Sequence, residues 1–587
     1  MLMKNLFLIV IILAVILSYS NIFSNEFVWD DISFLHEWSD MKNFNLARLV
    51  SGSLPRGHEG TYRPVRSIIT AVSYQLWKEN PGGYHAFSLL IHLGCTLLIY
   101  FIVLEITKEI NLAFFTGLLF GLHPIHTEAV TFITASFDII GVLFLLISLY
   151  LYIKDKKYYS MGFAALAFFT YEIALVLPVL LIAYDYFFRK EVYWKRYLPY
   201  ISIMLAYLMI RTFIIKVPAR GSYLGGSLYL TMLAISKVIL KYISLLLFPI
   251  GQNVNHLISK GIFSYSYAEN MYGVSGQSVL DFHILISLAV IIMLFYFIYK
   301  FRNSSPNVSF SIAFFFISLL PVLGFLPQAI LLAEKYLYLA SFGFCFFVGY
   351  IISLLYKNKK TGFVTLVIFI LLAASYSFLA IKRNTVWQDE ISLWQDSIGK
   401  NPNVLAYNGL GYAYTKKSNV DLAIYNYKKA IRLNPYYAVA HMNLGLAYMD
   451  KHNISLAIEE FKKAAEFDYF FSPETHFLLG SAYHDSGNLE LAISEYEKAL
   501  AINPDYERAL HDLAVAHSQL GKYGTAIGYY KKALTINPSN IDAHYNLGLL
   551  YYNQKKFDKA GQQLQQALSI NPDHKKSKIL LGRIEKN

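Results

Sequence analysis

Two adjacent carboxylates, Asp30 and Asp31, follow the first apolar stretch of the chain, in the segment Glu26-Phe-Val-Trp-Asp-Asp-Ile-Ser-Phe34. A charged side chain this close to a bilayer face is costly unless it has a partner or a task. The pair therefore suggests chemistry at the membrane surface. The alternative is that the two aspartates cap a short juxtamembrane helix.

Further acids, histidines and cations lie in turns or within apolar runs of the first 400 residues. These candidate site residues are Arg63, His123, His126, Glu128, Asp138, Glu172, Glu334 and Lys335. Each has a structural alternative as a turn histidine, a helix cap, a lipid-headgroup anchor or a member of an ion pair. His123, His126 and Glu128 have the types of zinc ligands, but the helical His-Glu-x-x-His spacing is missing, so no metal site is assigned.

Composition places these residues in an integral membrane protein. The 587 residues are 56% hydrophobic and 15% charged, with a mean hydropathy of +0.40, whereas soluble domains carry about 25% charged residues. Residues 401–587 hold 21 Lys and Arg against 18 Asp and Glu, which leaves +9 of the net charge of +12 in the first 400 residues. That excess fits the positive-inside bias and does not indicate nucleic-acid binding. Cys95 and Cys345 lie in apolar runs and are expected to be buried thiols.

About eleven apolar runs are predicted to cross the bilayer. They are 5–22, 85–104, 111–123, 130–152, 158–170, 173–188, 197–216, 283–300, 309–327, 334–356 and 362–381. Basic clusters, such as Lys357 with Lys359 and Lys360, mark the cytoplasmic turns. This topology places the candidate residues and the second half of the chain outside the cytoplasm.

The count of eleven requires that residues 229–250 do not cross. Lys237 and Lys241 suit a helix that lies in the interface with its lysines snorkelling to the headgroups. If this stretch spans instead, the orientation of everything downstream inverts.

A period of 34 residues dominates the chain from residue 403. Leu-Gly or Leu-Ala pairs recur with their leucines at Leu410, Leu444, Leu479, Leu513, Leu547 and Leu581. This is the tetratricopeptide pattern, in which helix pairs stack into an α-solenoid that presents a groove to a peptide or a partner protein. The predicted organisation is a membrane domain over 1–382, a connecting helix or linker over 383–402, five repeats over 403–574 and a capping helix over 575–587.

Taken together, these features resemble the transmembrane and tetratricopeptide-repeat O-mannosyltransferase-like family, which belongs to the GT-C class of glycosyltransferases. The matching segments are Phe27-Val-Trp-Asp-Asp31, Tyr62-Arg-Pro64, Tyr84-His85 with His92, Gly121 to Val130, Tyr171-Glu172, Ala333 to Leu339, and Arg383 to Trp394. The chain departs from the family at two points: Ser136 precedes Asp138 where the family often has Arg, and Ser88 stands where Asn is expected.

The resemblance implies an all-α chain, with a polytopic helix bundle of GT-C type followed by the solenoid. It implies transfer of a mannose-like sugar from a polyprenyl- or dolichyl-phosphate donor to a protein hydroxyl, with inversion, on the non-cytoplasmic face. Asp30 or Asp31 would take the proton of the acceptor hydroxyl. Arg63, His126 or Lys335 would hold the charge of the leaving phosphate, and the other candidates would line the donor site.

Two other functions remain open at this point. The chain could be a membrane-anchored scaffold without catalysis, although acids and histidines gathered on one face argue against it. A transporter is a weaker alternative, because no matched pair of broken helices occurs in two halves. Lipid-linked sugar is the expected co-substrate, and no cofactor or divalent metal is indicated. A bacterial inner membrane with periplasmic repeats is favoured over an endoplasmic-reticulum membrane with lumenal repeats.

Overall fold

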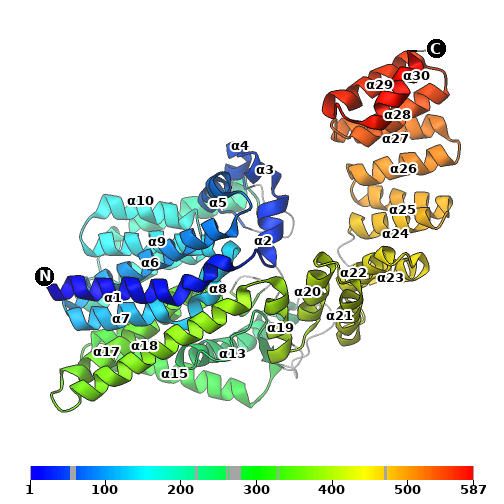
Figure 1. Cartoon of the computed structure of the whole chain (residues 1–587). Coiled ribbons are helices and arrows are strands. Elements are labelled where there is room, and N and C mark those ends of the chain that lie inside the picture. The colour runs from blue at the N-terminus through cyan, green and yellow to red at the C-terminus, as the bar shows by residue number, and fades with distance from the viewer. Residues whose placement is uncertain are drawn as a thin grey trace. The chain divides into compact units, whose positions relative to one another are not determined.

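The computed structural model describes residues 2–52, 61–217, 223–259, 262–263, 279–325, 327, 330–467 and 472–585. The chain divides into two compact units, residues 1–402 and 403–587. Helices dominate both units (Figure 1), and within the described ranges the strands are the short antiparallel pair β1 (Leu257–Ser259) and β2 (Ile262–Phe263). The all-α fold class is therefore confirmed.

Seven helices of the described part are long and apolar enough to cross a membrane. They are Met3–Ser24, Pro81–Thr107, Ile133–Ile153, Leu228–Leu247, Phe282–Phe301, Glu334–Lys357 and Gly362–Trp387. Three shorter apolar helices, Ile110–Leu122, Leu198–Ile214 and Pro306–Val322, coincide with other runs that were predicted to cross. The expected runs 158–170 and 173–188 contain α10 (Lys157–Phe168) and α11 (Leu177–Tyr184).

Three groups of helices build most of the first unit. The helices α1 (Leu2–Tyr19), α7 (Ile110–Leu122), α17 (Leu337–Lys357) and α18 (Gly362–Asn384) run side by side (Figure 1). On the other side of α7, α6 (Pro81–Thr107) packs against α9 (Ile133–Ile153), which in turn contacts α10. The remaining long helices, α13 (Leu228–Leu247), α15 (Phe282–Phe301) and α16 (Pro306–Leu319), pack in sequence, and α16 contacts α17. A Cβ added at Gly349 of α17 would lie 2.6 Å from Thr116 Oγ1 of α7, so glycine permits this close approach.

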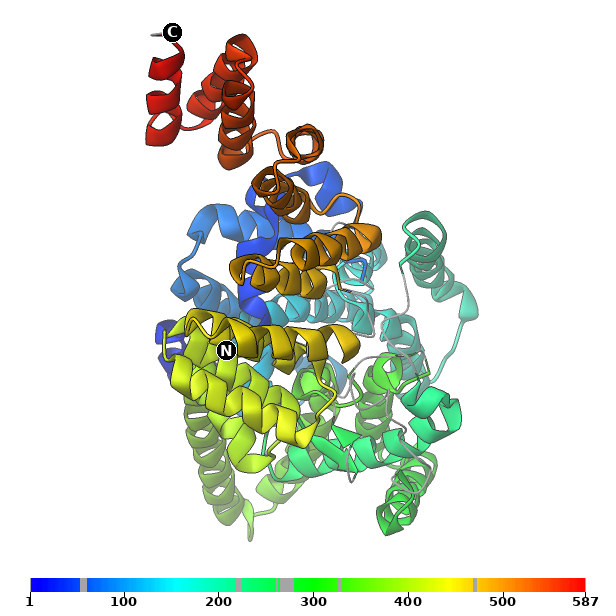
Figure 2. The same ribbon diagram turned by 90° about the vertical axis from the view of Figure 1, so that its right-hand side faces the viewer.

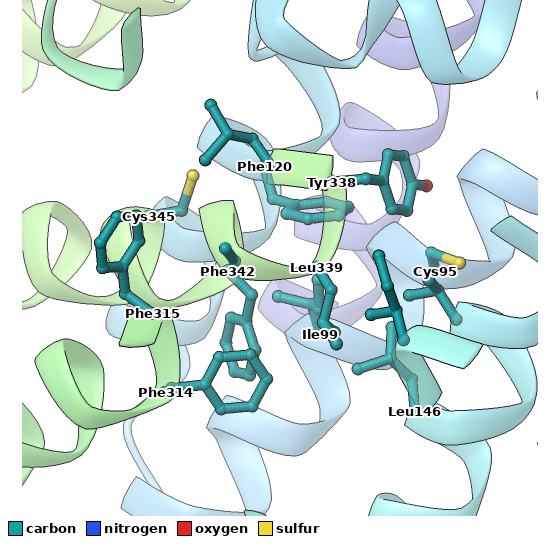
Figure 3. Close-up of a cluster of buried hydrophobic side chains, with 14 of the residues drawn as sticks. Cys95, Ile99, Phe120, Leu146, Phe314, Phe315, Tyr338, Leu339, Phe342 and Cys345 are labelled. Atoms are coloured by element: carbon teal, nitrogen blue, oxygen red, sulfur yellow. The ribbon is translucent and has the colours of Figure 1, made fainter. Parts of the chain in front are cut away.

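The core of the first unit is apolar and aromatic (Figure 3). Cys95 of α6 and Cys345 of α17 are both buried, unbonded thiols within it, as predicted. Figure 3 shows them at separate places in the cluster. They fill space between helices and form no cross-link.

The snorkelling predicted for the Lys237 side chain was wrong. Its ammonium is buried and lies 2.5 Å from Asp281 Oδ2, and it also donates to Val279 O at 3.0 Å. The residue does not snorkel, because Asp281, just before α15, supplies a partner. The helix that carries it, α13, is itself among the seven that are long and apolar enough to span.

The second unit is a stack of antiparallel helix pairs (Figure 2). The pairs are α20 and α21 (Val404–Lys416, Val420–Leu433), α22 and α23 (Ala438–Asp450, Ile454–Phe467), α24 and α25 (Pro473–Asp485, Leu489–Ile502), α26 and α27 (Glu507–Gln519, Tyr523–Ile536), and α28 and α29 (Ile541–Asn553, Phe557–Ile570). The last helix, α30 (Lys575–Ile584), packs on α29, and residues 586 and 587 of the expected cap lie outside the described residues. This is the predicted α-solenoid.

Candidate functional site

The segment that carries the two aspartates is fixed at both ends. Glu26 N donates to Gln388 O at 2.8 Å, which ties the segment to the chain just after α18. Asp31 N donates to Val28 O at 3.0 Å, and the short helix α2 (Asp30–Ile32) follows. The backbone around the aspartates therefore has a defined position between α1 and α5 (Pro64–Trp77).

Asp31 is completely buried and anchors this segment to α9. Its Oδ1 accepts hydrogen bonds from both the backbone N and Oγ1 of Thr134, each at 2.6 Å, and its Oδ2 accepts one from Val28 N at 3.3 Å. The carboxylate thus satisfies a backbone donor in the first turn of α9. Burial raises the pKa of Asp31 to about 7, although these hydrogen bonds act in the opposite direction.

Asp30 has a different environment. It is partly exposed, and none of the residues that the structure describes donates a hydrogen bond to its carboxylate. Burial raises the pKa of Asp30, while the positive charges of Lys335 and Arg66 lower it. Of the two acids, Asp30 is the one whose oxygens are available to a further partner.

Lys335 lies beside Asp30 on a one-turn helix that leads into α17. Its backbone N donates to Glu128 Oε2 at 3.1 Å, which fixes the turn. Its ammonium lies 5.8 Å from the centroid of the Phe132 ring and forms no ion pair with any carboxylate in the described ranges. The cation is therefore available next to the open carboxylate of Asp30.

The other two acids near this point are buried. Glu334 Oε1 accepts from Asn253 N at 2.6 Å and from His256 Nε2 at 2.9 Å, so Glu334 holds the segment after α13. Burial raises the pKa of Glu128, and the charge of Lys335 opposes this effect. Glu334 belongs to the turn that carries Lys335, and Glu128 accepts a hydrogen bond from the backbone of that turn.

Arg63 and Arg66 form a buried network with Asp138 and Glu172. Arg63 donates from Nη1 to Asp138 Oδ1 at 2.7 Å and from Nε to Glu172 Oε2 at 2.6 Å. Arg66 Nε lies 3.0 Å from the same Asp138 oxygen, and its Nη2 donates to Thr134 O at 2.8 Å. The charges of two arginines thus balance the charges of two acids. Ser136 cannot supply a basic partner to Asp138, and Arg63 and Arg66 supply it instead.

This network excludes one structural alternative that the sequence left open and bears out another. Arg63 and Arg66 are buried and do not extend to lipid headgroups. Asp138 has an ion-pair partner in each of two buried cations, Arg63 and Arg66. Because Arg63 also lies 4.9 Å from the centroid of the Tyr171 ring, its guanidinium is enclosed by partners on several sides.

The two histidines of the 123–126 turn are enclosed in the core. His123 Nε2 lies 3.1 Å from Leu246 O and its Nδ1 accepts from Ile125 N at 3.2 Å, so both ring nitrogens are used by backbone groups. His126 Nε2 lies 2.7 Å from Ser341 Oγ, and its ring contacts Phe120 and Tyr338. Burial lowers the pKa of His126 well below its usual range.

Sequence reasoning missed the aromatic residues around Asp30. Trp29 is stacked on Phe132, and Trp394 of α19 (Glu390–Lys400) meets Trp29 edge-on. The one signal of this cluster in the sequence is the position of Trp29 directly before Asp30. No group of three or more His, Cys, Asp or Glu side chains in the described part is arranged to hold a metal ion.

The structure therefore sorts the ten candidates into three places. Asp30, Lys335, Glu128 and Glu334 lie together around the turn that begins α17. Arg63, Asp138 and Glu172 form the neighbouring ion network, to which Asp31 is linked through Thr134. His123 and His126 lie in the core.

Comparison with known proteins matches both halves of the chain. Family models described as TPR repeat match residues 411–452, 480–521 and 517–555, and one described as Tetratricopeptide repeat matches 541–574. The chain is 26% identical over 392 residues to a protein O-mannosyl-transferase of Caenorhabditis elegans, an alignment that covers 64% of this chain and 54% of the relative. It is 23% identical over 501 residues to protein O-mannosyl-transferase TMTC3 of Homo sapiens, covering 75% of this chain and 52% of the relative.

The chain thus spans about half the length of these two curated relatives. Among solved structures, the crystal structure of MamA is 31% identical and covers 28% of this chain and 95% of its own, with a TM-score of 0.27.

Proposed function

We propose that the chain, which is similar to the protein O-mannosyl-transferases and carries tetratricopeptide repeats, transfers a sugar from a lipid-phosphate donor to a protein hydroxyl. The observation that supports this most directly is that the ammonium of Lys335 acts electrostatically on the carboxylate of Asp30, while neither group has an ion-pair partner among the residues that the structure describes. The other acids and cations of the site are already engaged with one another or with the backbone.

Asp30 is the proposed general base. The oxygen of the acceptor hydroxyl forms a bond to the anomeric carbon of the sugar while the bond from that carbon to the phosphate oxygen breaks. The hydroxyl proton passes to Asp30, whose carboxylate accepts no competing hydrogen bond from the described part of the chain. A single displacement of this kind inverts the anomeric configuration.

Lys335 is the proposed partner of the leaving phosphate. Negative charge grows on the phosphate oxygen as the bond to the sugar breaks, and a fixed cation stabilises that charge most effectively where water is largely excluded. The hydrogen bond from Lys335 N to Glu128 holds the turn, so the ammonium is positioned before the donor arrives. Glu128 and Glu334 serve this arrangement as positioning residues.

Four residues are proposed to hold the segments of the site in place without contacting the donor: Asp31, Arg63, Asp138 and Glu172. Asp31 keeps the 26–32 segment on α9, and the arginine network fixes the start of α5 against α9. His123 and His126 maintain the turn that carries Glu128. None of these side chains needs to touch the donor for the reaction to proceed.

The proposed reaction takes place on the non-cytoplasmic face, with the repeats recruiting the acceptor protein. The distribution of basic clusters supports this orientation on the premise that α13 does not cross the bilayer, and stacked tetratricopeptide repeats offer a surface for an extended peptide. A bacterial inner membrane with periplasmic repeats is the favoured location.

The test uses the purified full chain in detergent with radiolabelled undecaprenyl- or dolichyl-phosphate mannose and a Ser/Thr-rich peptide or protein acceptor. We expect transfer by the wild type, loss of transfer in Asp30→Asn, and retention of transfer in the control Asp40→Asn, an acid of the same loop that pairs with Arg48 instead. Full transfer by Asp30→Asn would remove the base assignment. Absence of transfer from either donor would favour the non-catalytic scaffold.

A further inference from the structure

A stack of three aromatic rings ends beside Asp30. Phe132 is stacked on Trp387, with centroids 5.3 Å apart and planes at 22°, and Trp29 is stacked on Phe132 at 5.7 Å and 10°. Trp394 supports Trp29 edge-on at 5.5 Å and 69°. Phe132, Trp387 and Trp394 are all buried, whereas Trp29 is partly exposed. Of these four residues, Trp29 is the one with solvent-exposed surface.

The backbone holds Trp29 in an unusual conformation. Its φ of 51° and ψ of −121° lie in a region that side chains other than glycine rarely adopt. Such a conformation is strained and persists only where the surroundings enforce it. Here the bond from Glu26 N to Gln388 O and the bonds of the Asp31 carboxylate fix the chain on both sides.

Three different chemical groups lie near one another around Trp29. Trp29 and Asp30 are consecutive, so the indole and the open carboxylate project from neighbouring residues. Lys335 lies against Phe132, the middle ring of the stack. An aromatic face, a carboxylate and an ammonium are thus arranged within a single partly exposed area.

From this arrangement we propose that the indole of Trp29 binds the pyranose ring of the lipid-linked sugar and holds its anomeric carbon between Asp30 and Lys335; this inference rests on the proposed function. The C–H groups on one face of a pyranose are apolar and pack on aromatic rings. Positive charge develops on the sugar ring during glycosyl transfer, and the electron-rich face of an indole attracts positive charge. Trp29 is accordingly a substrate-binding residue that also favours the transition state.

The contrast with Trp77 shows which features are specific to Trp29. Trp77 is likewise partly exposed and has aromatic neighbours, but it meets Tyr84 at 69° and Phe87 at 46° and lies at the end of α5. Trp77 is therefore the matched control for loss of one indole from the first unit.

The experiment compares full-length Trp29→Tyr, Trp29→Leu and Trp77→Leu with the wild type. Quenching of tryptophan fluorescence is measured with polyprenyl-phosphate mannose and, separately, with the same polyprenyl phosphate lacking the sugar. We expect a quench specific to the mannose-bearing lipid in the wild type and in Trp77→Leu, and its loss in Trp29→Leu. Trp29→Leu should also lower kcat/KM for the donor by about tenfold or more, with both a higher KM and a lower kcat, whereas Trp29→Tyr keeps most of the activity.

The melting temperature of each variant separates binding from folding, and Trp29→Gly adds a second check because glycine adopts the same φ without strain. If Trp29→Leu or Trp29→Gly retains wild-type binding of the mannose lipid, or if the sugar-free lipid gives the same quench, the inference is overturned. Normal transfer by Trp29→Leu would also overturn it while leaving the proposed function intact. Sugar-specific binding that depends on Trp29 without any transfer would overturn the proposed function and leave the inference standing.

Discussion

Asp31 and Thr134 are joined by two hydrogen bonds that share one carboxylate oxygen, from the backbone N and from Oγ1 of Thr134, each 2.6 Å long. The second acid of the Asp-Asp pair is thereby committed to the start of α9. A base that must receive a proton cannot at the same time have its oxygens saturated by donors that hold the fold together. The two aspartates therefore have different roles. Asp31 fixes the segment, and the carboxylate of Asp30 remains available to a substrate.

Removing the bond from Thr134 Oγ1 should destabilise the protein. Thr134→Val keeps the shape of the side chain but leaves a buried carboxylate with one donor fewer, and a hydrogen bond to a charged group contributes about 1.5–3 kcal/mol. We expect a melting temperature several degrees lower in detergent, and Asp40→Asn serves as the surface control. An unchanged melting temperature would mean that the bond contributes nothing.

Asp31 should also make stability depend on pH. Its pKa is raised to about 7 in the folded protein, against 3.8 as the ordinary value, so the folded state binds the proton more tightly than the unfolded state. The contribution of Asp31 to stability is therefore full below about pH 4 and is lost as pH rises to about 7. The difference in melting temperature between pH 5 and pH 8 should shrink in Asp31→Asn, and an identical difference in both proteins would contradict this assignment.

Lys335 should set the pH at which the proposed base becomes active. Its charge lowers the pKa of Asp30 against the effect of burial, so Lys335→Met should raise that pKa and shift the acid limb of the kcat/KM profile to higher pH. The same variant should reduce the maximal rate because the leaving phosphate loses a cation. The control is Lys78→Met, a lysine at the end of α5. A reduced rate with an unmoved acid limb would separate Lys335 from Asp30.

The membrane helices and repeats were predictable from the sequence because each depends on a local pattern. Apolar runs mark helices whatever their neighbours, and the Leu-Gly recurrence marks a stack in which each repeat meets only the next. The site was predictable as a set of residue types. Which acid remains open was not, because it depends on Thr134, some 100 residues from Asp31 along the chain.

Two other outcomes show the same limit. Lys237 is an amphipathic side chain that would suit an interface, but its partner Asp281 precedes a different helix. Arg63 carries the charge that a phosphate site needs, yet Asp138 and Glu172 reach it from two other segments. Pairing between distant segments, which a single sequence does not display, decided each case.

Arg63 should be required for folding more than for donor binding. Arg63→Met leaves Glu172 and Asp138 without their shared cation, and breaking a buried pair on one side costs about 3–5 kcal/mol. Arg63→Lys should not restore stability, because a single ammonium cannot reproduce the donors that the guanidinium directs to the two acids. We expect a low yield of monodisperse protein and a reduced melting temperature for both variants.

The control for this prediction is Arg48→Met, whose exposed side chain lies 3.8 Å from Asp40 and should contribute little. In Arg63→Met, adding Glu172→Gln should recover part of the lost stability, because one uncompensated, partly buried charge is removed. If Arg63→Met melts normally but loses affinity for a lipid-phosphate sugar, the arginine acts on the donor directly.

The repeats should respond unequally to the same glycine substitution. A Cβ at Gly445 would lie 2.6 Å from Cε1 of the Phe461 ring, which is buried and cannot move aside easily, whereas one at Gly548 would lie 3.1 Å from Leu564 Cγ. Overpacking of this kind costs about 1–3 kcal/mol, and the gain in helix propensity from Gly to Ala, about 1 kcal/mol, offsets only the milder contact. Gly445→Ala should therefore make the repeats of the full-length protein clearly more sensitive to limited proteolysis as temperature rises, with Gly548→Ala close to the wild type. The reverse order would show that the Phe461 ring yields more readily than the Leu564 side chain.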